Sequence, residues 1–192
     1  MKTTYDGLAA LGWNRWFAQR AAFAPGQTIA RVAAVDRDQW LLVDQTGALA
    51  DSGRISQDLE LIYEAYDAQG ADDFVVPAGE AWRVHEVEVP GTYPSGGGPA
   101  LTARVHFYSD DGGLPGEERY RAIVSGVDGD GDGALVLALD HPAVLPAGRW
   151  WVSVQAIMDY IPYLWWYWRQ SAVQAGEDSA WRNPNDGFGD GY

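Results

Sequence analysis

Apolar and polar side chains alternate along much of the chain after residue 70, and this alternation predicts β-strands. Residues 82–89 and 103–108 alternate almost without interruption, as a half-buried strand requires. Residues 134–139 and 150–155 are further strand candidates, as is a shorter apolar run at 74–76. Turns rich in Gly and Pro separate these runs. Short strands at this spacing are typical of an antiparallel β-sandwich or barrel.

The first forty residues follow a different pattern. Residues 7–23 show helical periodicity, which predicts a short amphipathic helix that ends at Pro25-Gly26. Residues 28–35 and 40–43 then predict two strands joined by a polar turn. We find no internal repeat. The expected fold is therefore an antiparallel β-sandwich, of jelly-roll or immunoglobulin-like type, with a short N-terminal helix and a partial OB-like hairpin. Residues 1–39 and 40–192 are the expected parts.

Composition narrows the functional classes. The chain has 192 residues, no cysteine and a net charge of −14, so disulfides and thiolate metal sites are excluded. Residues 1–38 carry +2, from five basic and three acidic residues, so the remainder carries −16. An acidic body disfavours nucleic acid, because nucleic acids bind through Lys and Arg. We expect no membrane span, since no run of about eighteen apolar residues occurs. We expect no signal peptide, since Arg15 and Arg20 interrupt the candidate apolar stretch.

Residues 11–43 resemble a known protein family over three short sequences. LGWNRWF at 11–17, followed by APG at 24–26 and ARVAAVDRDQWLLV at 30–43, resembles the N-terminus of the circularly permuted ribosome-assembly GTPases. The resemblance implies the start of an OB-fold that contacts ribosomal RNA. No G-x-x-x-x-G-K-[ST] sequence is present, so GTP hydrolysis is not carried over. One alternative function is therefore RNA or ribosome contact, through the basic residues Arg15, Arg20, Arg31 and Arg37.

A longer resemblance covers residues 40–192. SQDLELIYEAYDAQGADDFVVPAGEAW at 56–82, HFYSDDGGLPG at 106–116, WWVSVQAIMD at 150–159 and AWRNPNDGFGDG at 180–191 resemble a β-sandwich accessory module of secreted and cell-surface bacterial proteins. The resemblance implies no general activity, but an accessory or adhesion role. The family usually has a signal peptide and a closing strand after its last signature. Without that strand a sheet edge stays open, and residues 28–35 are the candidate that fills it. The chain thus combines a cytoplasmic-type start with an extracellular-type body. The cellular location stays undecided, and an artificial join without evolved function is a further alternative.

Asp128, Asp130 and Asp132 alternate with glycines, as in the first half of an EF-hand loop. Their hard oxygen ligands would suit Ca²⁺. The position that should carry the closing Glu is Leu139, however, and the flanks predict strands. A solvated Asp/Gly turn explains the sequence better than a cation site does.

The aromatic stretch at 160–168 is the second candidate site. Strand alternation places Trp166 and Trp168 on one face, and Trp165 and Tyr167 on the other. One set should be core. The other set could be an exposed platform for sugar rings, with Trp165, Trp166 and Trp168 as the candidate ligand-binding residues, although packing of both sets explains the stretch better.

No pattern specifies an enzyme. His85, His106 and His141 are scattered, and no G-x-S-x-G sequence surrounds a serine. A glycosidase carboxylate pair chosen from so many acids would be arbitrary. The sequence therefore predicts a non-catalytic binding, adhesion or structural module of extracellular type, with Ca²⁺ as a candidate stabilising ion. A glycan or a protein surface is the expected partner, and a glycan-acting enzyme is the remaining alternative.

Overall fold

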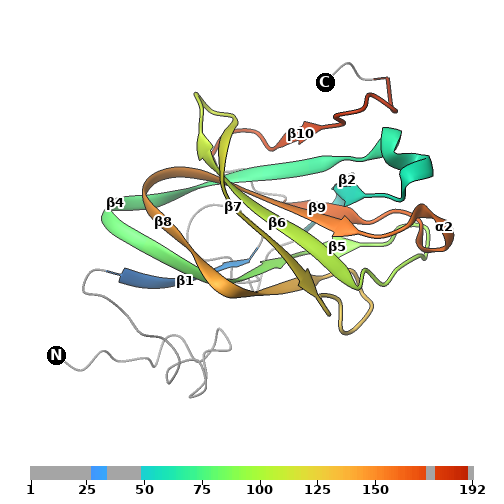
Figure 1. Ribbon diagram of the computed structural model, residues 1–192, viewed down its shortest axis with the longest axis horizontal. Coiled ribbons are helices and arrows are strands. Elements are labelled where there is room, and N and C mark those ends of the chain that lie inside the picture. Colours follow the sequence, from blue (N-terminus) through green and yellow to red (C-terminus); the bar gives the residue numbers. More distant parts are fainter. Residues whose placement is uncertain (1–26, 34–48, 172–175, 190–192) are drawn as a thin grey trace.

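Strands dominate the chain, which confirms the predicted mainly β, antiparallel architecture. The computed structural model describes residues 27–33, 49–171 and 176–189 (Figure 1). In chain order, its elements are β1 (Gln27–Ala33), β2 (Leu49–Ile55), β3 (Gln57–Asp58), the 3-10 helix η3 (Leu61–Tyr66), β4 (Gln69–Val89), β5 (Gly91–Thr92), β6 (Thr102–Asp110), β7 (Pro115–Ser125), β8 (Leu135–Ile157), α2 (Tyr160–Tyr163), β9 (Tyr167–Ser171) and β10 (Ala180–Arg182). None of the described helices has both the length and the apolar character needed to cross a membrane.

The strands form two sheets. The larger has the order β1-β4-β8-β6-β7, with β10 added beside β4 and β3 beside β8; the smaller has the order β2-β9-β5. Alternation places Ala103, Val105 and Phe107 of β6 in the core, where they are fully buried. Trp166 and Trp168 belong to the same buried cluster and bring the smaller sheet against it.

Two strands are much longer than the sequence predicted. Residues 74–76 and 82–89 are parts of the single strand β4, and 134–139 and 150–155 merge likewise into β8. Each strand bends at a Pro-Ala-Gly sequence, and the bends lie opposite each other: Val76 pairs with Gly148, and Ala81 pairs with Pro146. Proline cannot donate to the ladder, and Gly79 and Gly148 adopt positive φ angles of 85° and 139°. The paired bends turn both strands at one end of the molecule (Figure 1).

The N-terminal strand is part of the larger sheet. β1 runs parallel to the second half of β4, from Gln27 opposite Ala81 to Ala33 opposite Glu88. An edge of that sheet is therefore paired with residues 27–33. The predicted helix at 7–23 and the predicted strand at 40–43 lie outside the described residues. The division at residue 39 stays a prediction.

Candidate functional site

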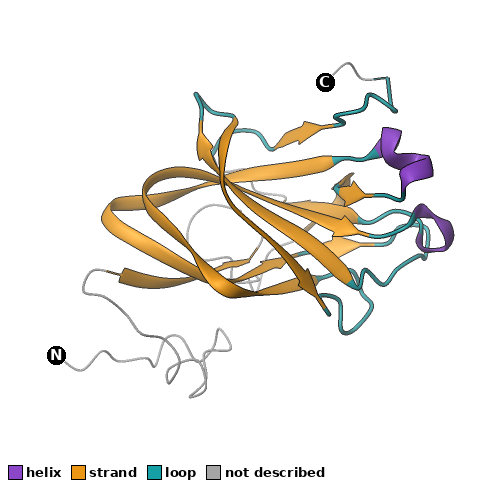
Figure 2. Ribbon diagram, in the orientation of Figure 1, coloured by secondary structure: helices purple, strands orange, loops and turns teal. Residues whose placement is uncertain are grey.

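Partly exposed aromatic side chains gather at the end of the sandwich where η3 and α2 lie side by side (Figure 2). They come from four segments that are far apart in sequence: η3, the α2 region, β10 and the C-terminal turn. Neighbouring ring centroids are 4.8–6.0 Å apart, which is the normal range for aromatic pairs. The contacts run from Tyr63 to Tyr160, Trp165 and Phe188, and Phe188 also contacts Tyr66 and Trp181.

The C-terminal turn is held on η3 by the buried side chain of Asn183. Its amide nitrogen donates to the carbonyl oxygens of Ala65 (2.8 Å) and Asp67 (2.7 Å). Its amide oxygen accepts from the backbone N–H of Phe188 (3.1 Å). Gly187 approaches the same helix so closely that a Cβ there would lie 2.2 Å from the Ala65 oxygen. These contacts place the Phe188 ring among the other aromatic rings.

The loop that carries Trp165 is held by Gln57 of β3. This side chain is fully buried, and its amide nitrogen donates to the carbonyl oxygens of Met158 (2.8 Å) and Leu164 (3.0 Å). Its amide oxygen accepts from the backbone N–H of Trp166 (2.8 Å). One residue therefore satisfies three backbone groups between β8 and β9, which fixes where the aromatic stretch begins.

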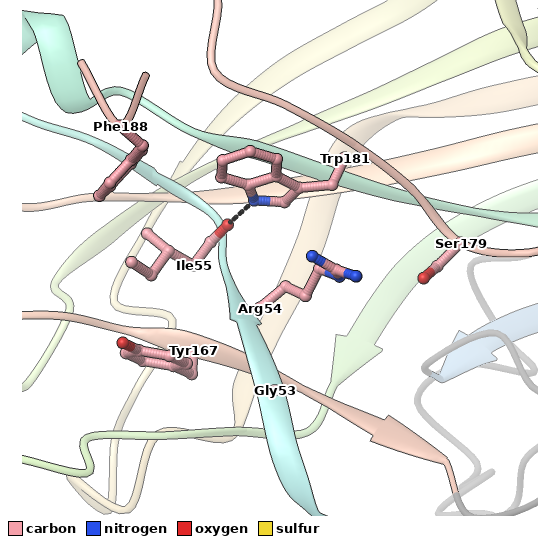
Figure 3. Close-up of a pocket in the computed structure, with 7 residues that line it drawn as sticks. All are labelled: Gly53, Arg54, Ile55, Tyr167, Ser179, Trp181 and Phe188. Carbon is pink, nitrogen blue, oxygen red and sulfur yellow. Dashed lines mark hydrogen bonds between the residues drawn. The ribbon is translucent and has the colours of Figure 1, made fainter. Parts of the chain in front are cut away.

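Beside these rings lies an open hollow of about 680 Å³, shown in Figure 3. The indole N–H of Trp181 donates to the carbonyl oxygen of Ile55 (2.8 Å), which fixes the ring on β2. β2 and β9 meet here, with Ile55 opposite Tyr167. The lining residues are Gly53, Arg54, Ile55, Tyr167, Ser179, Trp181 and Phe188.

The polar side chains of the hollow are available to a ligand. Arg54 and Ser179 are exposed and Tyr167 is half-exposed. None of the three side chains has a hydrogen-bond or ion-pair partner among the described residues. The lining thus combines two fixed aromatic rings, a guanidinium and two hydroxyl groups, which is the mixed character of a ligand site.

Comparison with protein-family models, curated proteins and solved structures finds no match for this chain. The two resemblances drawn from its sequence stay predictions.

The predicted tryptophan platform is divided by the fold. Trp166 is fully buried and Trp168 is 8% exposed, so both belong to the core, and an exposed platform cannot include them. The indole N–H of Trp166 donates to the carbonyl oxygen of Gly133 (2.8 Å) inside that core. Trp165, on the opposite face, lies in the aromatic series described above. The alternation therefore predicted the two faces correctly. Of the three candidate tryptophans, Trp165 alone lies outside the core and near the hollow.

The three aspartates at 128–132 do not assemble a cation site. Asp128 is buried and accepts hydrogen bonds from the Tyr93 hydroxyl (2.6 Å) and the Gly131 N–H (2.9 Å). Asp132 accepts from the Ala134 N–H (2.9 Å), while Asp130 is exposed. Within the described part of the chain, no three acidic or imidazole side chains are grouped so that they could hold a metal ion. The carboxylates serve the turn instead, because Asp readily accepts from nearby backbone N–H groups.

The hydrogen bond to Asp128 also fixes Tyr93. Its hydroxyl accepts from the Ala100 N–H (2.6 Å), so it connects the aspartate turn to the start of the β6 region. Burial, with the Asp128 contact as a smaller cause, raises the pKa of the Tyr93 phenol well above its usual value.

Arg15, Arg20 and Arg37, the basic residues of the RNA alternative, lie outside the described residues. Arg31 lies in β1, opposite Glu86 of β4. That alternative stays a prediction.

His106 lies next to a carboxylate and a serine, the residue types of a hydrolytic triad. The Nδ1 of His106 lies 2.7 Å from a carboxylate oxygen of Glu118, and Ser153 is its cross-strand partner on β8. However, Ser153 is fully buried, and neither its hydroxyl nor the His106 Nε2 has a hydrogen-bond partner within the described part of the chain. A serine hydroxyl without access to substrate cannot act as a nucleophile, so this trio does not form a hydrolytic site in the observed conformation.

The sequence did not identify the lining of the hollow. Trp181 and Phe188 both stand in the signature AWRNPNDGFGDG, so the signal was present, but it pointed to a family and not to a site. Tyr167 stood in the candidate aromatic stretch, but Arg54 and Ser179 carry no sequence signal. The pairing of β2 with β9 and the hydrogen bond from Trp181 to Ile55 bring these segments together.

Proposed function

We propose that this chain is a non-catalytic binding module that takes a glycan in the hollow beside Trp181 and Phe188. Fixed aromatic rings lie in the same lining as three polar side chains that have no partner among the described residues, and this combination carries the proposal. Pyranose rings have apolar faces that pack on aromatic rings, and their hydroxyl groups need hydrogen-bond partners. The lining offers both.

The residue types that line the hollow favour binding of a glycan over its hydrolysis. Glycoside hydrolysis usually requires two carboxyl groups that flank the scissile bond. The described lining contains no Asp, Glu or His side chain. The resemblance of residues 40–192 to an accessory module of secreted and cell-surface proteins supports the same proposal.

A glycan titration tests this function. Several tryptophans lie at or beside the hollow, so intrinsic fluorescence of the full chain should change as a mixed panel of mono- and oligosaccharides is added. Tyr167→Ala should weaken binding of any sugar that responds by roughly tenfold, the equivalent of losing one aromatic contact. Tyr163→Ala is the matched control, since Tyr163 is 36% exposed and does not line the hollow. Equal losses in the two variants, or no response to any sugar, would contradict the proposal.

A protein surface is the second candidate partner, and exposed apolar side chains favour it. Leu61 and Ile62 on η3 are each 80% exposed, and Ile161 on α2 is 61% exposed. These residues lie outside the lining of the hollow. Changing both Leu61 and Ile62 to Ser should therefore leave glycan binding unchanged and abolish binding of a protein that uses this end. Loss of glycan binding in the double variant would contradict this separation of the two surfaces.

A further inference from the structure

We infer that the glycan held in the hollow is an acidic sugar, whose carboxylate binds the guanidinium of Arg54. This inference rests on the proposed function, since it names the class of sugar for the same site.

Arg54 has the charge and the accessibility to bind a carboxylate. It is the charged side chain of the described lining, it is exposed, and no carboxylate of the described residues pairs with it. Several other arginines have acidic partners: Arg104 lies 2.7 Å from Asp58, Arg119 lies 2.7 Å from Glu117, and Arg149 lies 3.0 Å from Asp73. In a chain with 27 acidic and 13 basic residues, an arginine kept apart from every described acid is suited to an anion from outside.

The hydrogen-bond donors of Arg54 and Ser179 lie on the same side of the hollow. Figure 3 shows the Arg54 guanidinium extending toward the side of the hollow where Ser179 lies, below the indole ring of Trp181. A guanidinium can donate two parallel hydrogen bonds to one carboxylate, and hydroxyl groups can donate to its remaining lone pairs. Ser179 supplies such a hydroxyl group on that side of the hollow, whereas the Tyr167 hydroxyl points away from Arg54 and lies elsewhere in the lining (Figure 3).

The aromatic rings of the hollow are held in place by the fold. The Trp181 indole N–H is already bonded to Ile55, so this ring offers a ligand its apolar face and not its donor. Phe188 lies beside it, with ring centroids 5.9 Å apart. A small inorganic anion would leave both faces unused, and a neutral sugar would leave the guanidinium unused. A carboxylate-bearing sugar uses both kinds of surface.

The net charge restricts the ligand further. A chain with a net charge of −14 repels long polyanions at a distance, while one local cation still attracts a single carboxylate. The fit is therefore to a short or sparsely charged acidic glycan, and not to a densely charged polymer.

The test uses three matched probes on the full chain: methyl glucuronide, its neutral methyl ester, and methyl glucoside. Calorimetry or ligand-observed NMR should show the glucuronide binding roughly ten- to hundredfold more tightly than either neutral sugar, the range of a hydrogen bond to a charged group. Arg54→Gln should remove this preference and leave the weak binding of the neutral sugars in place. Arg119→Gln changes the net charge equally at a site outside the hollow and should retain the preference.

The outcomes separate this inference from the function on which it rests. If acidic and neutral sugars bind equally to the unsubstituted chain, the inferred preference for an acidic sugar is overturned and the glycan-binding function stands. If no sugar binds, the function and the inference both fail. If sodium acetate displaces the glucuronide at equal concentration, the site takes a simple anion, and the assignment to a sugar is overturned.

Discussion

Arg149 lies 3.0 Å from a carboxylate oxygen of Asp73, and this ion pair connects β8 to β4 next to the paired bends. Asp73 is fully buried, whereas the Arg149 side chain is 29% exposed and also contacts Glu177. The same aspartate accepts a hydrogen bond from the Glu177 N–H (3.0 Å). The pair therefore attaches the segment before β10 to the centre of the larger sheet, upstream of Ser179 and Trp181 in the hollow.

Removing the Arg149 guanidinium should destabilise the fold. Arg149→Ala removes the arginine that pairs with this buried carboxylate, and the loss of such a pair typically destabilises a protein by about 3–5 kcal/mol. Urea unfolding followed by tryptophan fluorescence measures the change. Arg119→Ala is the control, because it breaks an exposed pair with Glu117 that should contribute only about 0–1 kcal/mol. Similar midpoints for the two variants would mean that water reaches Asp73 once Arg149 is gone.

Asn183 should matter far more than its neighbour Asn185. Asn183→Ala removes three hydrogen bonds and leaves two carbonyl oxygens and one N–H to find water, a loss of about 3 kcal/mol. Asn185→Ala removes one exposed bond to Glu64 and should cost about 1 kcal/mol or less. Thermal unfolding ranks the two. Because Asn183 also places Phe188, its variant should lose glycan binding at temperatures where it is still folded; retained binding would show that Phe188 does not need this anchor.

Calcium should not stabilise the chain through residues 128–132. A ligand that binds only the folded state raises stability by mass action, but the carboxylates of Asp128 and Asp132 already serve the turn. Thermal unfolding in Ca²⁺ and in EGTA should therefore agree. Asp128→Ala should cost about 1–3 kcal/mol, because it removes the bonds to Tyr93 and Gly131.

Asp130 supplies the contrast for that experiment. It is exposed, and Asp130→Ala should change stability by no more than about 0.5 kcal/mol. A Ca²⁺-dependent rise in melting temperature that disappears in Asp130→Ala would contradict the assignment of this segment as a turn.

Local pattern was enough to predict a mainly β, antiparallel fold and several of its core faces. The alternation in β6 identified the buried side chains at 103, 105 and 107, and the same period separated Trp166 and Trp168 from Trp165. Alternation works in β6 because the side chains at 103, 105 and 107 face the main core, whereas Tyr108 on the other face packs in a smaller buried cluster with Ala71 and Trp151. β7 was missed, since its run of charged residues, exposed over much of its length, leaves little apolar signal.

The hollow could not be predicted in this way. Arg54 and Trp181 are separated by more than a hundred residues, and they meet because β2 pairs with β9 while β10 pairs with β4. The continuous course of β4 and β8 was also hidden, since Pro-Ala-Gly normally ends a strand. Two such sequences facing each other across one ladder allow both strands to bend together, a long-range relationship that no single window contains.

The stability of the fold should depend on pH through His106. Two effects oppose each other: burial lowers the pKa of the imidazole, and the hydrogen bond from its ring to Glu118 raises that pKa. Burial is the larger cause, so the pKa of folded His106 lies below the ordinary value of about 6.5. Arg104 and Arg121 lower the pKa further. The unfolded chain then binds the proton more readily than the folded chain does.

The contribution of His106 to stability should therefore be complete above pH 6.5 and be lost as the pH falls through its folded pKa. His85 has a pKa shifted in the same direction by burial and by Arg83, and it adds to the effect. Urea midpoints measured at pH 7.5, 6.5 and 5.5 should fall along this series, and His106→Gln should flatten the decline. His141→Gln, at an exposed position, should retain the slope of the natural chain. A midpoint that rises toward pH 5.5 and loses this rise in His106→Gln would show that the charged pair with Glu118 outweighs burial.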